Sequence, residues 1–164
     1  MATQAAQLPA GTDTTLYDLG RMAALWVSAF ETLAHPRKGN SGLDQVYLLL
    51  ENVSYLDHDV RRPRYKAHTG RTRIPPAHRV LPCWLYGKLY QARNNFLHGN
   101  PVRAKSRYAG RGSAVGLFWL APCVYRLALT GFLKLSPLQK PPNIFHTDPQ
   151  SIIERAILRA RKGR

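Results

Sequence analysis

The sequence contains few cysteines and lacks the features of a secretory signal. It has 2 cysteines in 164 residues, Cys83 and Cys123, and they form no C-x-x-C pair. This usage argues against a disulfide scaffold and against a zinc finger, and it is compatible with a reducing compartment. Residues 1–14 have neither the basic start nor the apolar run of a signal peptide. We therefore expect a cytoplasmic protein.

Acidic residues are absent from most of the second part of the chain. Residues 1–60 hold three Lys/Arg against seven Asp/Glu, whereas residues 61–164 hold 21 of the 24 Lys/Arg and two of the 9 Asp/Glu. No carboxylate occurs between Asp59 and Asp148, and the formal net charge is +15. Such a surface predicts a polyanionic partner, for which RNA, DNA and anionic lipid all qualify.

The pattern of apolar residues predicts an all-α fold, a compact bundle of four to five helices with long basic loops. Residues 1–12 are expected to form a flexible leader and residues 13–145 the helical domain. Residues 146–164 are expected to form a C-terminal helix with a basic tail.

Three of the expected helices lie within the first 100 residues. They cover about residues 14–33, 42–55 and 83–98, where apolar residues recur at intervals of three and four. Asp13 or Thr14 is a suitable N-terminal cap for the first helix, because a short polar side chain can accept a hydrogen bond from a free backbone N–H.

Residues 57–82 contain four prolines in a pattern that is neither helical nor strand-like, which predicts a long basic loop. Compact domains rarely keep such a loop without a use. The segment 57–59, Asp-His-Asp, could hold a divalent metal or form a solvated helix end, and we favour the helix end. A second basic loop follows residue 101. The basic side chains expected to bind RNA in these two loops are Arg61, Arg62, Arg64, Lys66, Arg71, Arg73, Arg103, Lys105 and Arg107.

Residues 113–135 are strongly apolar, and two interpretations are open for them. The segment is long enough for a membrane span. Arg126 near its middle and Pro122 favour a buried, kinked core helix instead. The last helix is well signalled. Asp148 can cap it, Pro149 suits a first turn, and Ser151 and Glu154 have the spacing of a capping box.

The third expected helix ends in LYQARNNFLHGN, which places Arg93, Asn94 and His98 in its last turns. Gly99 suits the position after a helix, and Pro101 cannot continue one. An Arg followed by a polar residue, and by a His five positions after the Arg, is a weak pattern by itself. At the end of an amphipathic helix and directly before a glycine it is considerably more specific.

This pattern resembles the signature of HEPN domains. The segment LWVSAFETLAH in the first expected helix also resembles the first helix of Apea-like HEPN proteins, so the resemblance covers about residues 14–135. It implies a homodimer whose active site lies between the protomers, and metal-independent cleavage of RNA in defence, as a toxin or in RNA processing. An acidic antitoxin or another protein partner would fit such a role. Asn100 stands where HEPN toxins silenced by nucleotide transfer usually have Tyr, so the resemblance does not extend to that regulation.

Helix geometry leads to the same arrangement of residues. Asn94 and His98 lie one turn apart on one face, about 6 Å along the axis. An Asn94 amide hydrogen bond could therefore fix which imidazole nitrogen faces the substrate. Arg93 and His98 are separated by roughly 140° around the axis and about 7.5 Å along it. A single helix does not aim both at one phosphate, but two copies about a twofold axis would.

The chemistry expected of such a site needs no cofactor. His98 would take the proton from a ribose 2′-hydroxyl or protonate the leaving 5′-oxygen. Arg93 would hold the phosphate, and cleavage would leave a 2′,3′-cyclic phosphate. A two-metal nuclease needs several carboxylates, which this half of the chain lacks. The alternative is a non-catalytic HEPN-type module that binds RNA or a partner protein, with His98 stabilised by the helix dipole.

Overall fold

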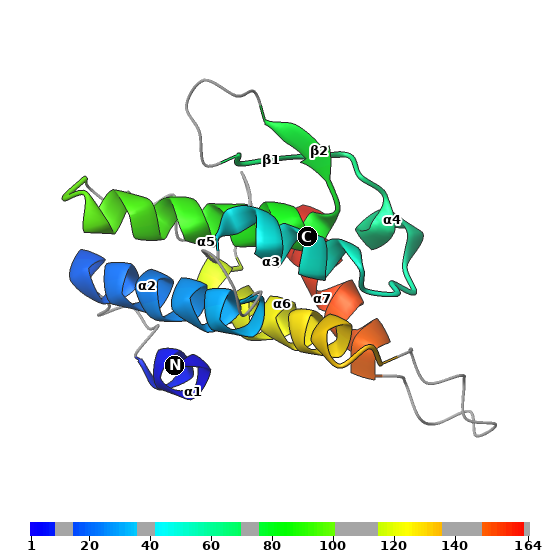
Figure 1. Ribbon diagram of the computed structural model, residues 1–164, viewed down its shortest axis with the longest axis horizontal. Coiled ribbons are helices and arrows are strands. Elements are labelled where there is room, and N and C mark those ends of the chain that lie inside the picture. The colour runs from blue at the N-terminus through cyan, green and yellow to red at the C-terminus, as the bar shows by residue number, and fades with distance from the viewer. Residues whose placement is uncertain (9–14, 36–41, 70–75, 101–114, 136–148, 163–164) are drawn as a thin grey trace.

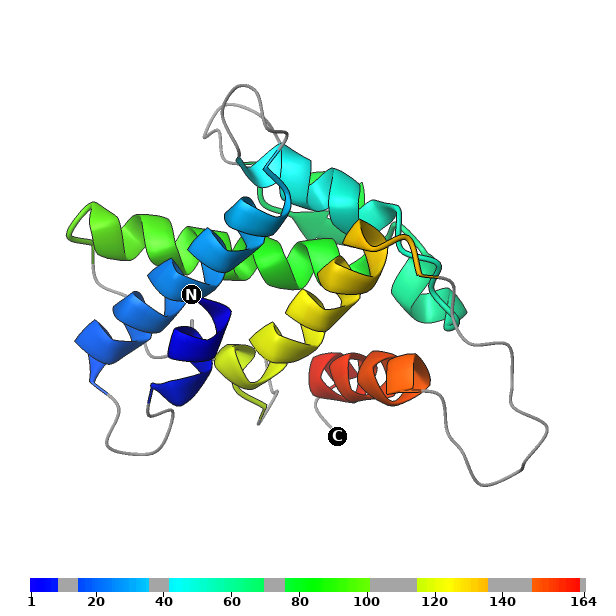
Figure 2. The same cartoon turned by 60° about the horizontal axis from the view of Figure 1, so that its bottom comes forward.

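Three long helices lie at the centre of the structure. In the computed structural model, α2 (Leu16–Leu33), α5 (Leu81–Leu97) and α6 (Leu117–Phe132) contact one another, and the shorter α3 (Leu43–Glu51) contacts all three (Figure 1, Figure 2). The predicted all-α bundle is confirmed. The structure describes residues 1–8, 15–35, 42–69, 76–100, 115–135 and 149–162.

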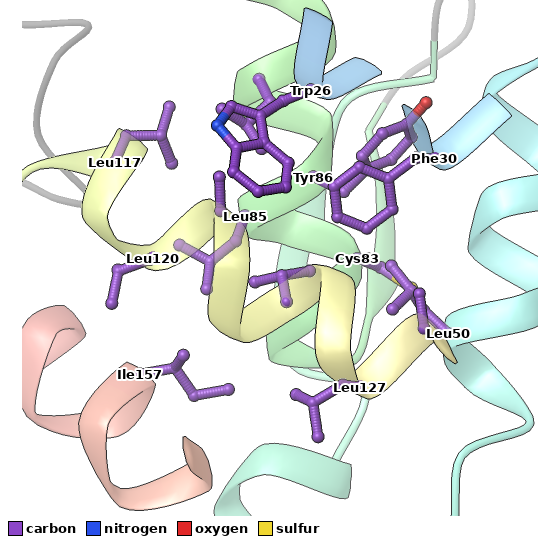
Figure 3. Packing of buried hydrophobic residues seen from close by; sticks show 14 of the residues in the cluster. Trp26, Phe30, Leu50, Cys83, Leu85, Tyr86, Leu117, Leu120, Leu127 and Ile157 are labelled. Carbon is purple, nitrogen blue, oxygen red and sulfur yellow. The ribbon is translucent and has the colours of Figure 1, made fainter. Parts of the chain in front are cut away.

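The core joins the apolar faces of these helices to the C-terminal helix α7 (Pro149–Lys162). Phe30, Leu50, Tyr86, Leu127 and Ile157 come from five different helices, and all are fully buried (Figure 3). The rings of Phe30 and Tyr86 lie 4.9 Å apart between centroids. Burial of each of the Phe, Leu and Ile side chains contributes about 1.5–3 kcal/mol. The central helix α5 is thereby fixed from several sides.

The start of α2 lies directly against the last turn of α5. A Cβ atom at Gly20 would overlap the ring of Phe96, so the absence of a side chain at this position permits the close approach. The ring of Phe96 also meets the edge of Tyr17 at a centroid distance of 5.6 Å. This packing fixes the end of α5, where the sequence predicts the functional residues.

The first long helix begins slightly later than expected. Its N-cap is Thr15, whose hydroxyl accepts a hydrogen bond from the backbone N–H of Asp18 at 3.1 Å. The carboxylate of Asp18 accepts the backbone N–H of Thr15 in return, at 3.1 Å. This reciprocal pair is a complete capping box. The expected caps Asp13 and Thr14 lie outside the described residues.

Part of the expected flexible leader is helical. Helix α1 (Ala2–Gln7) packs on α2, and Ala5 is buried in this contact. No apolar periodicity predicts this helix, because its apolar residues are mainly small alanines.

The prediction of a structureless loop over residues 57–82 is wrong for much of the segment. A short helix, α4 (His58–Arg61), is followed by an antiparallel pair, β1 (Tyr65–Ala67) and β2 (Ala77–Arg79), above α5 in Figure 1. In β1 the residues on either side of Lys66 are buried and Lys66 is exposed. This alternation is only three residues long, too short for sequence periodicity to detect.

The strongly apolar segment is a core helix, as expected. Helix α6 contains Pro122 and buries Leu117, Val124 and Leu127, among others. None of the helices in the described ranges is both long enough and apolar enough to cross a membrane.

Helix α7 is attached by a residue whose role was predicted incorrectly. Glu154 does not close a capping box within α7; its buried carboxylate accepts the backbone N–H groups of Leu56 at 3.0 Å and Asp57 at 2.6 Å. The Gln150 side chain donates to the same carboxylate at 2.7 Å. The contact joins α7 to the segment before α4. The expected cap Asp148 is not among the described residues.

Candidate functional site

Helix α5 ends where the sequence predicts. The backbone N–H of His98 donates to the Asn94 carbonyl at 3.0 Å, and His98 is the C-cap. Gly99 follows with φ +68°, a conformation that suits glycine. Its N–H donates to the Phe96 carbonyl at 3.1 Å. His98 is thereby held at the exposed end of a rigid helix.

Arg93 is held inside the molecule by a residue of the first long helix. Its Nη2 lies 2.7 Å from Oε1 of Glu31, and the two side chains are only 20% and 19% exposed. Its guanidinium carbon lies 4.9 Å from the centroid of the Tyr90 ring. The Arg93 side chain is therefore fixed by an ion pair on one side and an aromatic ring on another.

Burial affects the electrostatics of this ion pair. Removal from water raises the pKa of Glu31, and the neighbouring Arg93 lowers it by less. The hydroxyl of Tyr86 is close enough to Glu31 for the two to interact electrostatically, and it is buried without a hydrogen-bond partner among the described residues. The carboxylate thus lies in an environment that disfavours its charge, and Arg93 is its compensating cation.

Asn94 does not make the contact expected of it. Its Oδ1 accepts a hydrogen bond from Nη1 of Arg93 at 3.2 Å. Within the described residues, no hydrogen bond joins the Asn94 side chain to the imidazole of His98. In one chain the Asn94 side chain therefore contacts Arg93.

One chain alone does not bring Arg93 and His98 together. Arg93 faces α2 through Glu31, whereas His98 is exposed at the helix end. The helix places them roughly 140° apart. The dimer and a site at its interface are not tested by the structure of one chain and stay predictions.

The predicted RNA-binding residues fall into two groups. Arg61 and Arg62 are exposed at the end of α4, and Lys66 is exposed on β1. Arg64 already has an acidic neighbour, because its Nη2 lies 3.2 Å from Oδ1 of Asp59. The remaining predicted residues, Arg71, Arg73, Arg103, Lys105 and Arg107, lie outside the described ranges.

The segment 57–59 forms the start of a helix, the interpretation favoured from the sequence. Oδ1 of Asp57 accepts the backbone N–H of Asp59 at 2.7 Å and that of Val60 at 3.4 Å. Asp57 is thus the N-cap of α4.

Sequence reasoning missed two features of the molecule. Glu31 is the first, and its signal was an acidic residue directly after Phe30 in the apolar stripe of the first helix. The second is a cluster in which Lys88 and Arg161 both lie over the ring of Trp84. Only the tertiary structure places these two cations together, because they are far apart in the sequence.

No protein-family model, no curated protein and no solved structure matches this chain.

Proposed function

We propose that the chain is a metal-independent endoribonuclease of the HEPN type whose active site forms between two copies. The observation that carries the proposal is the end of α5, where an exposed His98 follows an Arg93 held in place by Glu31 and Tyr90. A fixed cation and an accessible imidazole, brought together only between two copies, suit cleavage of an RNA phosphodiester.

In this reaction the ribose 2′-oxygen attacks the adjacent phosphorus, and the bond to the 5′-oxygen breaks. His98 of one copy accepts the 2′-hydroxyl proton, and a protonated His98 of the other supplies a proton to the leaving oxygen. The products are a 2′,3′-cyclic phosphate and a 5′-hydroxyl. Arg93 stabilises the charge that develops on the phosphate oxygens.

Arg93 can keep Glu31 and still bind a phosphate. A guanidinium has five N–H donors. The hydrogen bonds to Glu31 and Asn94 use one donor on Nη2 and one on Nη1. The other three N–H groups make no hydrogen bond within the described residues, and in this proposal they donate to phosphate oxygens. Glu31 is then a positioning residue that keeps the guanidinium in a fixed place.

Exposed apolar residues near the end of α5 support a dimer there. Leu16, Tyr17 and Leu97 are 53%, 64% and 60% exposed, and Tyr17 is attached to the same turn through Phe96. Covering such side chains with a second copy would bring two α5 ends close to each other. Light scattering at micromolar concentration should give the mass of a dimer; a monomer would count heavily against the active site proposed here.

The ion pair itself favours a second candidate, a non-catalytic RNA-binding or protein-binding module. Glu31 and Arg93 connect α2 to α5 and are largely buried. An ion pair with a purely structural role would have the same position and burial. In that case His98 would be only an exposed helix end.

One experiment separates the two candidates. Purified protein is incubated with mixed RNA in EDTA, and cleavage and binding are both measured. For the nuclease, His98→Ala should lower the cleavage rate by about 10²–10⁴ and leave RNA binding intact. His58→Ala, at another exposed histidine, should cleave normally. RNA with 2′-methoxy groups and DNA should both resist. Cleavage that needs Mg²⁺, or that survives His98→Ala, would contradict the proposal.

A further inference from the structure

Helix α5 carries a second group of cations, on the side opposite Arg93. Nζ of Lys88 lies 4.6 Å from the centroid of the Trp84 ring. The guanidinium carbon of Arg161, from α7, lies 5.2 Å from the same ring. Two positive charges therefore share one indole, where α5, α7 and the hairpin strand β1 come together.

Neither cation has an acidic partner within the described part of the chain. Nε of Arg161 is buried and makes no hydrogen bond with any residue that the structure describes. The pKa of Lys88 is lowered, mainly by burial and further by the charge of Arg161. Two like charges held close together, one with a buried and unsatisfied donor, form an arrangement that an anion would stabilise.

The hairpin extends the cluster. The ring of Tyr65 on β1 lies 6.2 Å from that of Trp84. Arg64 lies over Tyr65, with its guanidinium carbon 5.3 Å from the ring centroid. Arg64 differs from the first two cations because it pairs with Asp59. In the described ranges, the charge of this cluster that has no acidic partner is therefore concentrated at Lys88 and Arg161.

The cluster lies in line with His98. Residues four, seven, eleven and fourteen positions after Trp84 all fall within about 40° of it around the helix axis. They are Lys88, Gln91, Asn95 and His98. This polar row covers about 21 Å along α5, whereas Arg93 lies roughly 180° from Trp84.

We propose that Lys88 and Arg161, held at Trp84, form a phosphate-binding site for the backbone of single-stranded RNA, about 15 Å along α5 from His98. An RNA strand bound there would follow the polar row to the helix end. The choice of RNA rests on the proposed function; the site itself rests on the unpaired cations. Phosphate oxygens would accept hydrogen bonds from the ammonium group of Lys88 and from the guanidinium of Arg161.

The test measures binding of a fluorescent, 2′-methoxy single-stranded RNA in EDTA, so that cleavage plays no part. Lys88→Met and Arg161→Met each remove a charge and keep an apolar side chain on Trp84. Each should weaken binding roughly tenfold. Each should also lower the slope of log affinity against log salt by about 0.7. Arg126→Met is the matched control, since it removes an exposed arginine from α6, and it should lose much less affinity.

The outcomes separate this site from the nuclease proposal. If wild-type protein does not cleave RNA but Lys88→Met and Arg161→Met still weaken binding selectively, the phosphate site stands without the nuclease. If cleavage depends on His98 while both variants bind as tightly as the Arg126→Met control, the phosphate site is refuted and the nuclease stands. The same variants are also tested for binding to vesicles that contain phosphatidylserine. If the protein binds these vesicles through Lys88 and does not bind RNA, the assignment of the site to RNA is overturned. Circular dichroism confirms that each variant is folded.

Discussion

The two sides of helix α5 carry cations in different electrostatic settings. On one side Arg93 is paired with Glu31 at 2.7 Å and lies over Tyr90. On the other side Lys88 and Arg161 share Trp84 without a carboxylate among the described residues. Net charge alone therefore does not identify a binding surface. A paired cation helps to hold the fold, whereas an unpaired and partly desolvated one is available to an anion.

The dependence of RNA binding on salt tests whether the unpaired cations dominate. The basic residues of 61–79, of 103–111 and of the C-terminal tail can together neutralise on the order of 6–10 phosphates, which implies a loss of about 10³–10⁵ in affinity between 50 and 200 mM salt. Fluorescence titrations over this range give the slope. Replacing Arg61, Arg62 and Arg64 with Ala should flatten it without unfolding the protein. A slope near zero in the wild type would refute the electrostatic argument.

The hydrogen bonds of Glu154 attach α7 to the rest of the molecule and thereby determine where Arg161 lies. Removing them tests how the cations at Trp84 are held in place. Glu154→Ala would leave the backbone N–H groups of Leu56 and Asp57 without an acceptor. At about 1–3 kcal/mol for each unsatisfied donor, we expect a loss of about 2–6 kcal/mol in the free energy of unfolding. Urea denaturation measures it. Glu154→Gln keeps one oxygen acceptor and should lose less; equal losses would mean that these hydrogen bonds do not anchor the helix.

Removing the paired cation and removing an unpaired one should change the free energy of unfolding differently. Arg93→Ala leaves Glu31 largely buried without its cation, and we expect a loss of about 1.5–3 kcal/mol in the free energy of unfolding. Lys88→Met removes a charge that burial already disfavours, and stability should stay the same or rise. Thermal and urea unfolding of the two variants give both values. A larger loss for Lys88→Met than for Arg93→Ala would reverse the comparison.

The smallest expected effect is the change in the stability contribution of Glu31 with pH. Burial raises the pKa of Glu31 above its usual value of 4.5, so the folded state binds this proton more tightly than the unfolded state. The contribution of Glu31 to stability is therefore present at low pH and is lost as pH rises through its folded pKa. Compared with Glu31→Gln, the wild type should lose stability as the pH rises above the usual carboxyl pKa of 4.5. Unfolding curves at several pH values test the sign; a relative gain by the wild type with rising pH would show that Arg93 outweighs burial.

Regular, repeated patterns were the predictable part of this molecule. The apolar spacing of Leu19, Trp26 and Phe30 predicted a helix close to α2, and the glycine after His98 predicted the end of α5. Such signals are local, because helix periodicity and a left-handed glycine depend on a few neighbouring residues. The buried position of Cys83 also agreed with its residue type.

The sequence alone was enough to predict the helical class, the strong positive charge of residues 61–164, and the position of Arg93 and His98 at a helix end. Only the tertiary structure decided which charges are compensated. Glu31 forms an ion pair with Arg93, and Glu154 accepts hydrogen bonds from the segment before α4. Lys88 and Arg161 both contact the ring of Trp84. The physical reason is that ion pairs form between residues distant in the chain, and sequence spacing carries no information about which helices pack together.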